Sequence, residues 1–320
     1  MEILIIGCGS LVKRRIIPAL ENLEAIEKIH IAGISASIPE NAVSKNKQGR
    51  LFNDYQTAIN SCEEALVYIS LPNSMHSYWA RAALKSGHHV IVDKPALTEF
   101  DDAQIIVELA ASKNLCVAEA NVWYHHPIVR TLKFFIGQQK APPLAIYSTF
   151  TSPAMNSRNF RYRTDMGGGA ILDRASYAIS CGRVLLGGMP VNVHCQKSPY
   201  LETREVETSF SLLANYDNGA VMLAFMSIEA EYRNCVEIIG CDYTLEVDRL
   251  FTPPDNYEAD IIMRQNNVTK KIQVSESNSF REFIGEVVKS VESGNFSYYS
   301  EVLLEDARVM NSIKISAKGE

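Results

Sequence analysis

The sequence predicts two domains: an N-terminal α/β domain on a parallel sheet, and a C-terminal α+β domain with a helix-covered, largely antiparallel open sheet. In residues 1–120, continuously apolar segments alternate with helical patterns, which is typical of parallel strands buried on both faces. From about Pro127 the composition favours strands, with a hairpin signal at Asp217-Asn218-Gly219. A length of 320 residues and a hydrophobic fraction of 47% suffice for two cores. We therefore expect domains at 1–120 and 121–320.

The first domain is predicted to alternate strand and helix. Pro18 is expected to kink the first helix, Ser74 to cap the third, and Gly87 to follow the end of the third. This alternation is, in outline, that of a doubly wound Rossmann domain. The predicted strands are 3–6, 29–34, 65–70, 89–92 and 116–118, and the predicted helices are 11–23, 55–59, 74–86 and 101–114.

The second domain is predicted to combine strands with a few helices. Its last helix, 301–315, carries an apolar stripe from Val302 to Ile313, so we expect it to pack back on the first domain. The other helices are expected at 128–136, 173–186 and 280–292, and the strands at 144–151, 191–197, 205–216, 220–229, 235–240 and 243–247.

Composition excludes several classes of protein. A net charge of −6 without a polybasic segment argues against a nucleic-acid partner or an anionic membrane. The seven cysteines are scattered and form no Cys-x-x-Cys pair, which favours reduced thiols in a cytoplasmic protein over a disulfide framework. The segment MEILIIGCGS is not typical of a signal peptide, and no apolar stretch is long enough to predict a membrane span.

A dinucleotide site is predicted at the first turn. Gly7-x-Gly9 follows a strand and precedes a helix, where backbone N–H groups can approach a pyrophosphate. Val12 occupies the third position of the fingerprint, so looser packing of helix on strand is expected there. A purely structural turn is the alternative. The cofactor contacts predicted here are Gly7, Gly9, Ser10 and Leu11.

The end of the second strand favours NADP(H) over NAD(H). NAD sites place an acidic residue there for the ribose hydroxyl, but this chain has none before Glu40. Ser37 could donate a hydrogen bond to a 2′-phosphate, and Lys45 and Lys47 lie downstream. A solvated lysine face is the alternative for the two lysines.

Two short segments at the carboxyl ends of strands predict further cofactor contacts. Leu71-Pro72-Asn73 and His76 follow the third strand, where ligands of such sheets bind, and Asn73 and His76 are expected near the nicotinamide ribose. A hydrogen-bonding role at the helix start is the alternative for His76. Asp93-Lys94-Pro95 ends the next strand; Lys94 can donate to a carbonyl oxygen and stabilise a developing alkoxide. A structural ion pair with Asp93 is the alternative.

The second domain supplies a possible proton donor. Tyr177 lies one helical turn after Asp173, and a nearby lysine lowers the pKa of a tyrosine. A core tyrosine is the alternative. Arg161 could hold a phosphate or carboxylate, or it is an ordinary surface arginine. Adjacent His125 and His126 point in different directions without a carboxylate at ligand spacing, so no metal is expected.

Taken together, these motifs resemble the glucose–fructose oxidoreductase/inositol dehydrogenase (Gfo/Idh/MocA) family over nearly the whole chain. The tyrosine, where many members have histidine, looks like the branch that holds glucose–fructose oxidoreductase, dimeric dihydrodiol dehydrogenases and nucleotide-sugar 3-ketoreductases. The segment 249–254 looks most like the last of these. Departures are Asp93 for the usual Glu, Ala175 for Gly, Tyr124 for an Arg, and Ser37 for the Arg that marks NADP. The resemblance implies that Lys94 and Tyr177 are catalytic and that substrate contacts come from Asp173, Arg161, Tyr124 and His125.

The expected function is that of an NAD(P)-dependent oxidoreductase which reduces a keto group on a nucleotide-linked carbohydrate. Oxidation of a free sugar, polyol or dihydrodiol is one alternative, and a non-catalytic NAD(P)-binding regulator is another. The resemblance leaves a third, a redox-neutral glycosidase that uses tightly held NAD. By resemblance, the open sheet of the second domain mediates a homodimer or homotetramer.

Overall fold

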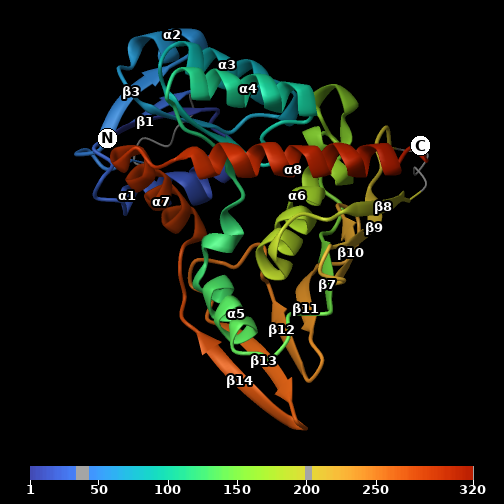
Figure 1. Ribbon diagram of the computed structural model, residues 1–320. Coiled ribbons are helices and arrows are strands. Elements are labelled where there is room, and N and C mark those ends of the chain that lie inside the picture. Colours follow the sequence, from blue (N-terminus) through green and yellow to red (C-terminus); the bar gives the residue numbers. More distant parts are fainter. Residues whose placement is uncertain (34–42, 199–203, 320) are drawn as a thin grey trace. The chain divides into compact units, whose positions relative to one another are not determined.

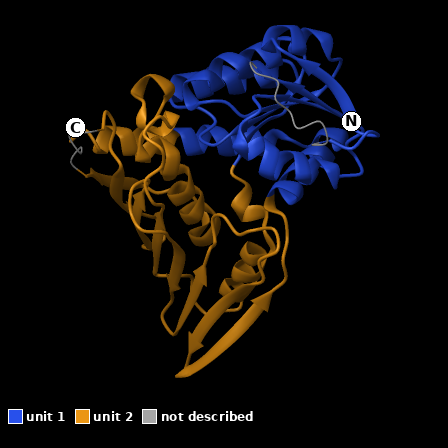
Figure 2. Ribbon diagram, turned by 180° about the vertical axis from the view of Figure 1, so that it is seen from behind, with its two compact units in different colours: residues 1–120, 280–307 blue, residues 121–279, 308–320 orange. Residues whose placement is uncertain are grey.

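The computed structural model describes residues 1–33, 43–198 and 204–319 (Figure 1). The chain forms two compact units, one of residues 1–120 with 280–307 and the other of residues 121–279 with 308–320 (Figure 2). Each unit has its own sheet.

The first unit is built on a six-stranded parallel sheet in the order β3-β2-β1-β4-β5-β6. This is the doubly wound order that the sequence predicts, and the fold class is confirmed. The order reverses at β1, which pairs with both β2 and β4, so ligands are expected at the carboxyl end of this strand. The strands are β1 Glu2–Ile6, β2 Lys28–Ala32, β3 Gln48–Phe52, β4 Leu66–Ile69, β5 His89–Asp93 and β6 Val117–Ala120.

Two helix starts in this unit differ from the prediction. The helix expected at 11–23 is a π-helical turn, Val12–Ile16, followed by α1, Ile17–Glu21, with Pro18 in its first turn. Val12 is fully buried at this wider turn. Ser74 does not cap α3, because a 3₁₀ turn at Asn73–Met75 leads directly into it. The remaining helices before residue 120 are α2 Tyr55–Ser61, α3 His76–Lys85 and α4 Phe100–Ser112.

Residues 280–307 cluster with the first unit, whereas the sequence assigned them to the second domain and expected only the last helix, 301–315, to pack back on the first. They form most of α7, Ser279–Ser293, and the first half of α8, Ser297–Ser316. In the first unit, the guanidinium of Arg15 lies 5.4 Å from the centre of the Phe280 ring, and Leu303 joins the hydrophobic core. Val309, Met310 and Ile313, farther along α8, belong to the core of the second unit.

The second unit contains an eight-stranded sheet in the order β14-β13-β12-β11-β7-β10-β9-β8. All neighbouring pairs are antiparallel except β7 with β10. The largely antiparallel sheet and the hairpin joining β9 to β10 are therefore confirmed. The strands are β7 Ala145–Thr151, β8 Asn192–Lys197, β9 Ser209–Asn215, β10 Val221–Ser227, β11 Arg233–Ile239, β12 Tyr243–Asp248, β13 Ala259–Gln265 and β14 Val268–Val274.

Besides the end of α8, two α-helices of the described chain belong to this unit. α5, Pro127–Gly137, begins at a proline, and the His126 side chain caps it by accepting from the N–H of Ile128. α6, Ala170–Gly182, packs on β7, β9 and β10. It begins three residues before the predicted start, because Gly169 provides the turn into it.

Candidate functional site

The first turn contains two glycines with different surroundings. Gly7 has φ 97°, and a Cβ there would lie 2.1 Å from the carbonyl oxygen of Ser70, so the packing of the fold itself requires glycine. A Cβ at Gly9 would have no heavy atom of the described chain within 4 Å. Ser10 and Leu11, which follow, are exposed at the start of the helical segment. The open space at Gly9 fits a phosphate approached by backbone N–H groups.

The residues predicted to favour NADP(H) over NAD(H) differ in what the structure shows of them. Ser37 lies outside the described residues. Lys47 donates to the carbonyl oxygens of Leu20, Glu21 and Leu23 at 3.2, 3.0 and 2.7 Å. Lys47 therefore caps the end of α1. The sequence had suggested either a phosphate ligand or a solvated lysine, and neither describes this position. Lys45 is exposed.

The loop after β4 is held by His76. Leu71 and Pro72 lead into a 3₁₀ turn whose first residue, Asn73, is buried. The His76 ring is fully buried; Nδ1 lies 2.9 Å from the Pro95 carbonyl oxygen and Nε2 lies 2.8 Å from that of Leu71. Both ring nitrogens thus face the main chain, which matches the alternative of a hydrogen-bonding role more closely than ribose binding.

Lys94 follows the carboxyl end of β5, and hydrogen bonds hold the chain on both sides of it. The carboxylate of Asp93 accepts hydrogen bonds from the hydroxyls of Tyr68 and Ser70, at 2.8 and 2.5 Å. On the other side, the Lys94–Pro95 peptide bond is cis, and the Ala96 N–H donates to Glu119 at 2.8 Å. Lys94 itself is half-buried at the edge of the sheet where the Gly7 turn and the Leu71 loop also lie.

In the second unit, the glycine triplet fixes the start of α6. The N–H groups of Gly168 and Gly169 donate to the carbonyl oxygens of Arg163 and Arg161, both at 2.9 Å. Glu207 accepts the next two N–H groups, that of Ala170 at its carbonyl and that of Ile171 at its carboxylate, each at 2.9 Å. Burial raises the pKa of the Glu207 carboxyl. The helix that carries Asp173 and Tyr177 therefore starts from a fully hydrogen-bonded turn.

Asp173 is buried between two arginines. Its Oδ1 accepts a hydrogen bond from Arg161 Nε at 2.8 Å, and its Oδ2 lies 3.1 Å from Arg174 Nε. The Arg174 guanidinium also lies 3.9 Å from the centre of the Phe150 ring. Arg161 is the more exposed of the two, with 31% of its side chain accessible. The structure thus brings together two residues, Asp173 and Arg161, that the sequence proposed separately.

Tyr177 stands in an aromatic cluster. Its ring packs edge-on against Phe150, with centres 4.9 Å apart, and lies 5.3 Å from Phe251. Phe150 and Phe251 stack on each other at 5.4 Å. Phe251 lies in the segment 249–254, which the resemblance singled out without a role for this residue. Its contact with Tyr177 connects positions far apart in the sequence, so no local pattern could have revealed it.

Tyr124 and His125 lie side by side in a 3₁₀ turn, Val122–His125, with ring centres 4.5 Å apart. The Arg183 guanidinium lies 5.4 Å from the centre of the Tyr124 ring, and Trp123 in the same turn donates to Ser180 on α6 at 2.9 Å. The turn is therefore tied to α6.

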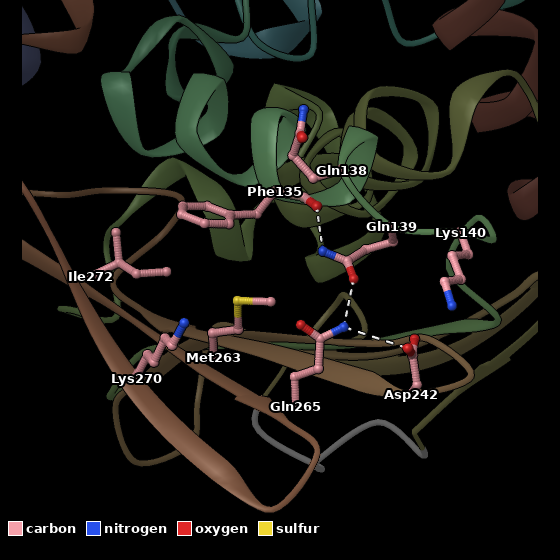
Figure 3. Close-up of a pocket in the computed structure, with 9 residues that line it drawn as sticks. All are labelled: Phe135, Gln138, Gln139, Lys140, Asp242, Met263, Gln265, Lys270 and Ile272. Atoms are coloured by element: carbon pink, nitrogen blue, oxygen red, sulfur yellow. Dashed lines mark hydrogen bonds between the residues drawn. The ribbon is translucent and has the colours of Figure 1, made fainter.

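A separate pocket of about 480 Å³ in the second unit lies between the end of α5 and the β13–β14 hairpin (Figure 3). Gln265 donates to Gln139 at 2.9 Å and lies 3.4 Å from Asp242, and Gln139 donates to the carbonyl of Phe135. None of the predicted site residues lines this pocket. Because it is separate from those residues, we assign it no part in the chemistry.

In the part of the chain that the structure describes, no group of three or more His, Cys, Asp or Glu side chains is arranged to hold a metal ion. No described helix combines the length and apolar character needed to cross a membrane.

Comparison with known proteins identifies the family. Residues 1–121 match the Gfo/Idh/MocA oxidoreductase family with its NAD-binding Rossmann fold, and residues 142–246 match the C-terminal domain of the same family. The chain belongs to this family of oxidoreductases, and the family resemblance seen in the sequence is confirmed.

Particular relatives cover nearly the whole chain. A dTDP-3,4-didehydro-2,6-dideoxy-alpha-D-glucose 3-reductase of Saccharopolyspora spinosa is 27% identical over 91% of this chain and 87% of the relative. A D-xylose 1-dehydrogenase (NADP(+)) of Haloferax volcanii is 24% identical over 91% and 89%. A solved 3-ketoreductase of Actinomadura kijaniata, in complex with NADP and TDP-benzene, has a TM-score of 0.89 at 24% identity and covers 99% of this chain and 97% of that one. The last comparison shows a shared fold.

Proposed function

We propose that this protein is an NADP(H)-dependent oxidoreductase that reduces a keto group on a dTDP-linked or similar nucleotide-linked hexose. The observation that carries the proposal is the full-length similarity to sugar-nucleotide 3-reductases. The retained Lys94 and Tyr177, at the end of a parallel strand and on α6, support it. A regulator without turnover would have no need for both side chains.

The cofactor fits the residues of the first unit. The open space at Gly9, beside exposed Ser10 and Leu11, accommodates a pyrophosphate at the start of a helical segment. We propose that the loop Leu71–Asn73 and the segment Asp93–Lys94 line the nicotinamide end, because both follow the carboxyl ends of neighbouring strands. When bound, NADPH supplies the hydride.

The side chains of the chain supply the remaining chemistry. Lys94 donates a hydrogen bond to the substrate carbonyl oxygen and stabilises the negative charge that develops there. Tyr177 delivers the proton to that oxygen. Asp173, held by Arg161 and Arg174, orients the sugar hydroxyls, and Tyr124 and His125 complete the substrate contacts. In this assignment the carboxylate of Asp173 is held in one orientation, because each of its oxygens already lies beside an arginine guanidinium.

The experiment is a fluorescence titration with NADPH and with NADH, repeated in the presence of dTDP, and followed by turnover of a dTDP-linked keto sugar. We expect NADPH to bind more tightly than NADH, and dTDP to perturb the bound state further. Turnover of a free pentose with no response to dTDP would instead support the second candidate, a free-sugar dehydrogenase, which the similarity to the xylose dehydrogenase favours. Binding of neither cofactor would contradict both.

We propose that the enzyme forms a homodimer or homotetramer through the open face of the second-unit sheet, and that it is cytoplasmic. Large apolar side chains on that face are exposed by 36–46%, and Leu223 lies opposite both Tyr147 and Leu213 on the neighbouring strands. Contiguous apolar surface of this kind marks a protein interface. Sedimentation of wild type and Leu223→Lys tests the proposal: the variant should dissociate while binding NADPH normally, and a wild-type monomer would contradict it.

A further inference from the structure

His76 differs from other histidines of this chain in what its ring faces. Nδ1 and Nε2 lie 2.9 and 2.8 Å from the carbonyl oxygens of Pro95 and Leu71. Carbonyl oxygens only accept hydrogen bonds, and a neutral imidazole carries a single N–H. In a neutral ring, the nitrogen without a proton would then direct its lone pair at the lone pairs of a carbonyl oxygen, and this repulsive contact would be fully buried. An imidazolium donates to both.

Another buried histidine of the same unit shows the neutral pattern. His88 accepts at Nδ1 from the N–H of Ala65 at 3.2 Å, and its Nε2 lies 2.9 Å from the carbonyl oxygen of Ile59. One donor and one acceptor satisfy these two partners, so His88 is neutral. The two histidines are equally buried, and only their partners differ.

A carboxylate compensates the charge of His76. Asp93 accepts from the hydroxyls of Tyr68 and Ser70, an arrangement that suits its ionised form. Burial lowers the pKa of His76 below its ordinary value, and the Asp93 charge and the carbonyl oxygens offset this effect only in part. Burial raises the pKa of Asp93, while the two hydroxyls and the charges of His76 and Lys94 oppose it. The geometry favours the charged ring, because only an imidazolium can donate to both carbonyl oxygens.

We propose that His76 is a positioning residue held permanently as an imidazolium, which ties the Leu71 loop to the turn after Lys94 and is neutralised by Asp93. Pro95, on one side of Lys94, is thereby held by the His76 ring, Asp93 on the other side is held by the hydroxyls of Tyr68 and Ser70, and Glu119 holds Ala96 beyond them. Its consequence for turnover rests on the proposed function, whereas the charge state of His76 does not.

The charge state is tested by ¹⁵N NMR of the full-length protein with ¹⁵N-labelled histidine. We expect both ring nitrogens of His76 to remain protonated across neutral and mildly alkaline pH, and His88 to show one protonated and one bare nitrogen in the same spectrum. His76→Gln and His88→Gln assign the two sets of signals, and two slowly exchanging ring N–H protons identify His76 if its variant does not fold. A bare nitrogen on folded His76 at neutral pH would overturn the proposal.

The positioning role is tested by kinetics. His76→Asn keeps a hydrogen-bond donor and loses the charge, so we expect kcat to fall by about tenfold or more, with a smaller change in the dissociation constant of NADPH. An unchanged kcat alongside a confirmed imidazolium would overturn the positioning role. If the wild type turned over no sugar nucleotide, the proposed function would fail, and the NMR result would still decide the charge state.

Discussion

Replacement of Gly169 by alanine should destabilise the protein for two separable reasons. The first is backbone conformation: Gly169 has φ 110° and ψ 150°, a region that is essentially restricted to glycine and costs other residues about 1–3 kcal/mol. The second is space, because a Cβ there would lie 2.6 Å from Oε1 of Glu207. The carboxylate would have to move away from the N–H of Ile171, and an unpaired buried N–H costs about 1–3 kcal/mol. Together these costs give about 4 kcal/mol.

Gly187→Ala is the matched control. Gly187 also has positive φ, 81°, but a Cβ there would have no heavy atom of the described chain within 4 Å. Only the cost of the left-handed backbone remains, about 1–2 kcal/mol. Gly169→Ala should therefore lose about 2 kcal/mol more than Gly187→Ala when each is compared with wild type.

Urea unfolding followed by tryptophan fluorescence measures both variants, because Trp123 is fully buried in the second-unit core. Activity provides a second readout: α6 carries Asp173 and Tyr177, so kcat should fall by about tenfold or more in Gly169→Ala and remain near wild type in Gly187→Ala. Equal losses of unfolding free energy in the two variants would refute the close packing of Gly169 against Glu207.

Three further predictions follow from the site. Tyr177→Phe and Lys94→Ala should each lower kcat by about 10²-fold or more; steady-state kinetics on variants with unchanged circular dichroism test this, and near-normal turnover would remove the residue from the mechanism. Burial raises the pKa of Glu207 above its ordinary value of 4.5, so the protonated carboxyl stabilises the fold at low pH, and this contribution is lost as pH rises through the raised pKa. Glu207→Gln should accordingly lose less unfolding free energy than wild type between about pH 4 and pH 7, and parallel urea titrations would contradict this if the two proteins changed alike. Phe251→Leu should cost less than about 1.5 kcal/mol of stability yet lower kcat, because Tyr177 loses an aromatic contact; unchanged kcat would show that the contact is only structural.

The elements that could be predicted from the sequence are those whose burial restricts them to apolar residues. The inner strands of the first sheet are covered on both faces, so each reads as an unbroken apolar segment. β3 was missed because it is an edge strand with mostly exposed side chains. The β13–β14 hairpin was missed because β14 is almost entirely exposed. Asn266 and Asn267, both with positive φ, form its turn and were the one available signal.

The residues proposed to do chemistry were visible in the sequence, and those that hold them were not. Lys94 and Tyr177 stand in short motifs because their chemistry requires a particular residue at the end of one element. Their support comes from distant segments: Glu119 binds the main chain 23 positions away, and Glu207 binds it 36 positions away. Lys47 shows the opposite case, a residue that looked functional in the sequence and is structural. Its charge suggested a phosphate ligand, but its ammonium group donates to three carbonyl oxygens at the end of α1.

The Gly7-x-Gly9 motif combines two requirements that a pattern match cannot separate. Gly7 is required by the protein itself, because the Ser70 carbonyl occupies the place of its Cβ, so Gly7→Ala should destabilise the fold whether or not a cofactor binds. Gly9 borders open space, so Gly9→Ala should leave the unfolding free energy within about 0.5 kcal/mol of wild type and weaken NADPH binding, because the new methyl group meets only the ligand. Urea unfolding and an NADPH titration on both variants measure the two effects. Unweakened binding in Gly9→Ala would mean that the pyrophosphate does not lie on this turn, and the glycine pair would then be evidence for a fold and not for a cofactor.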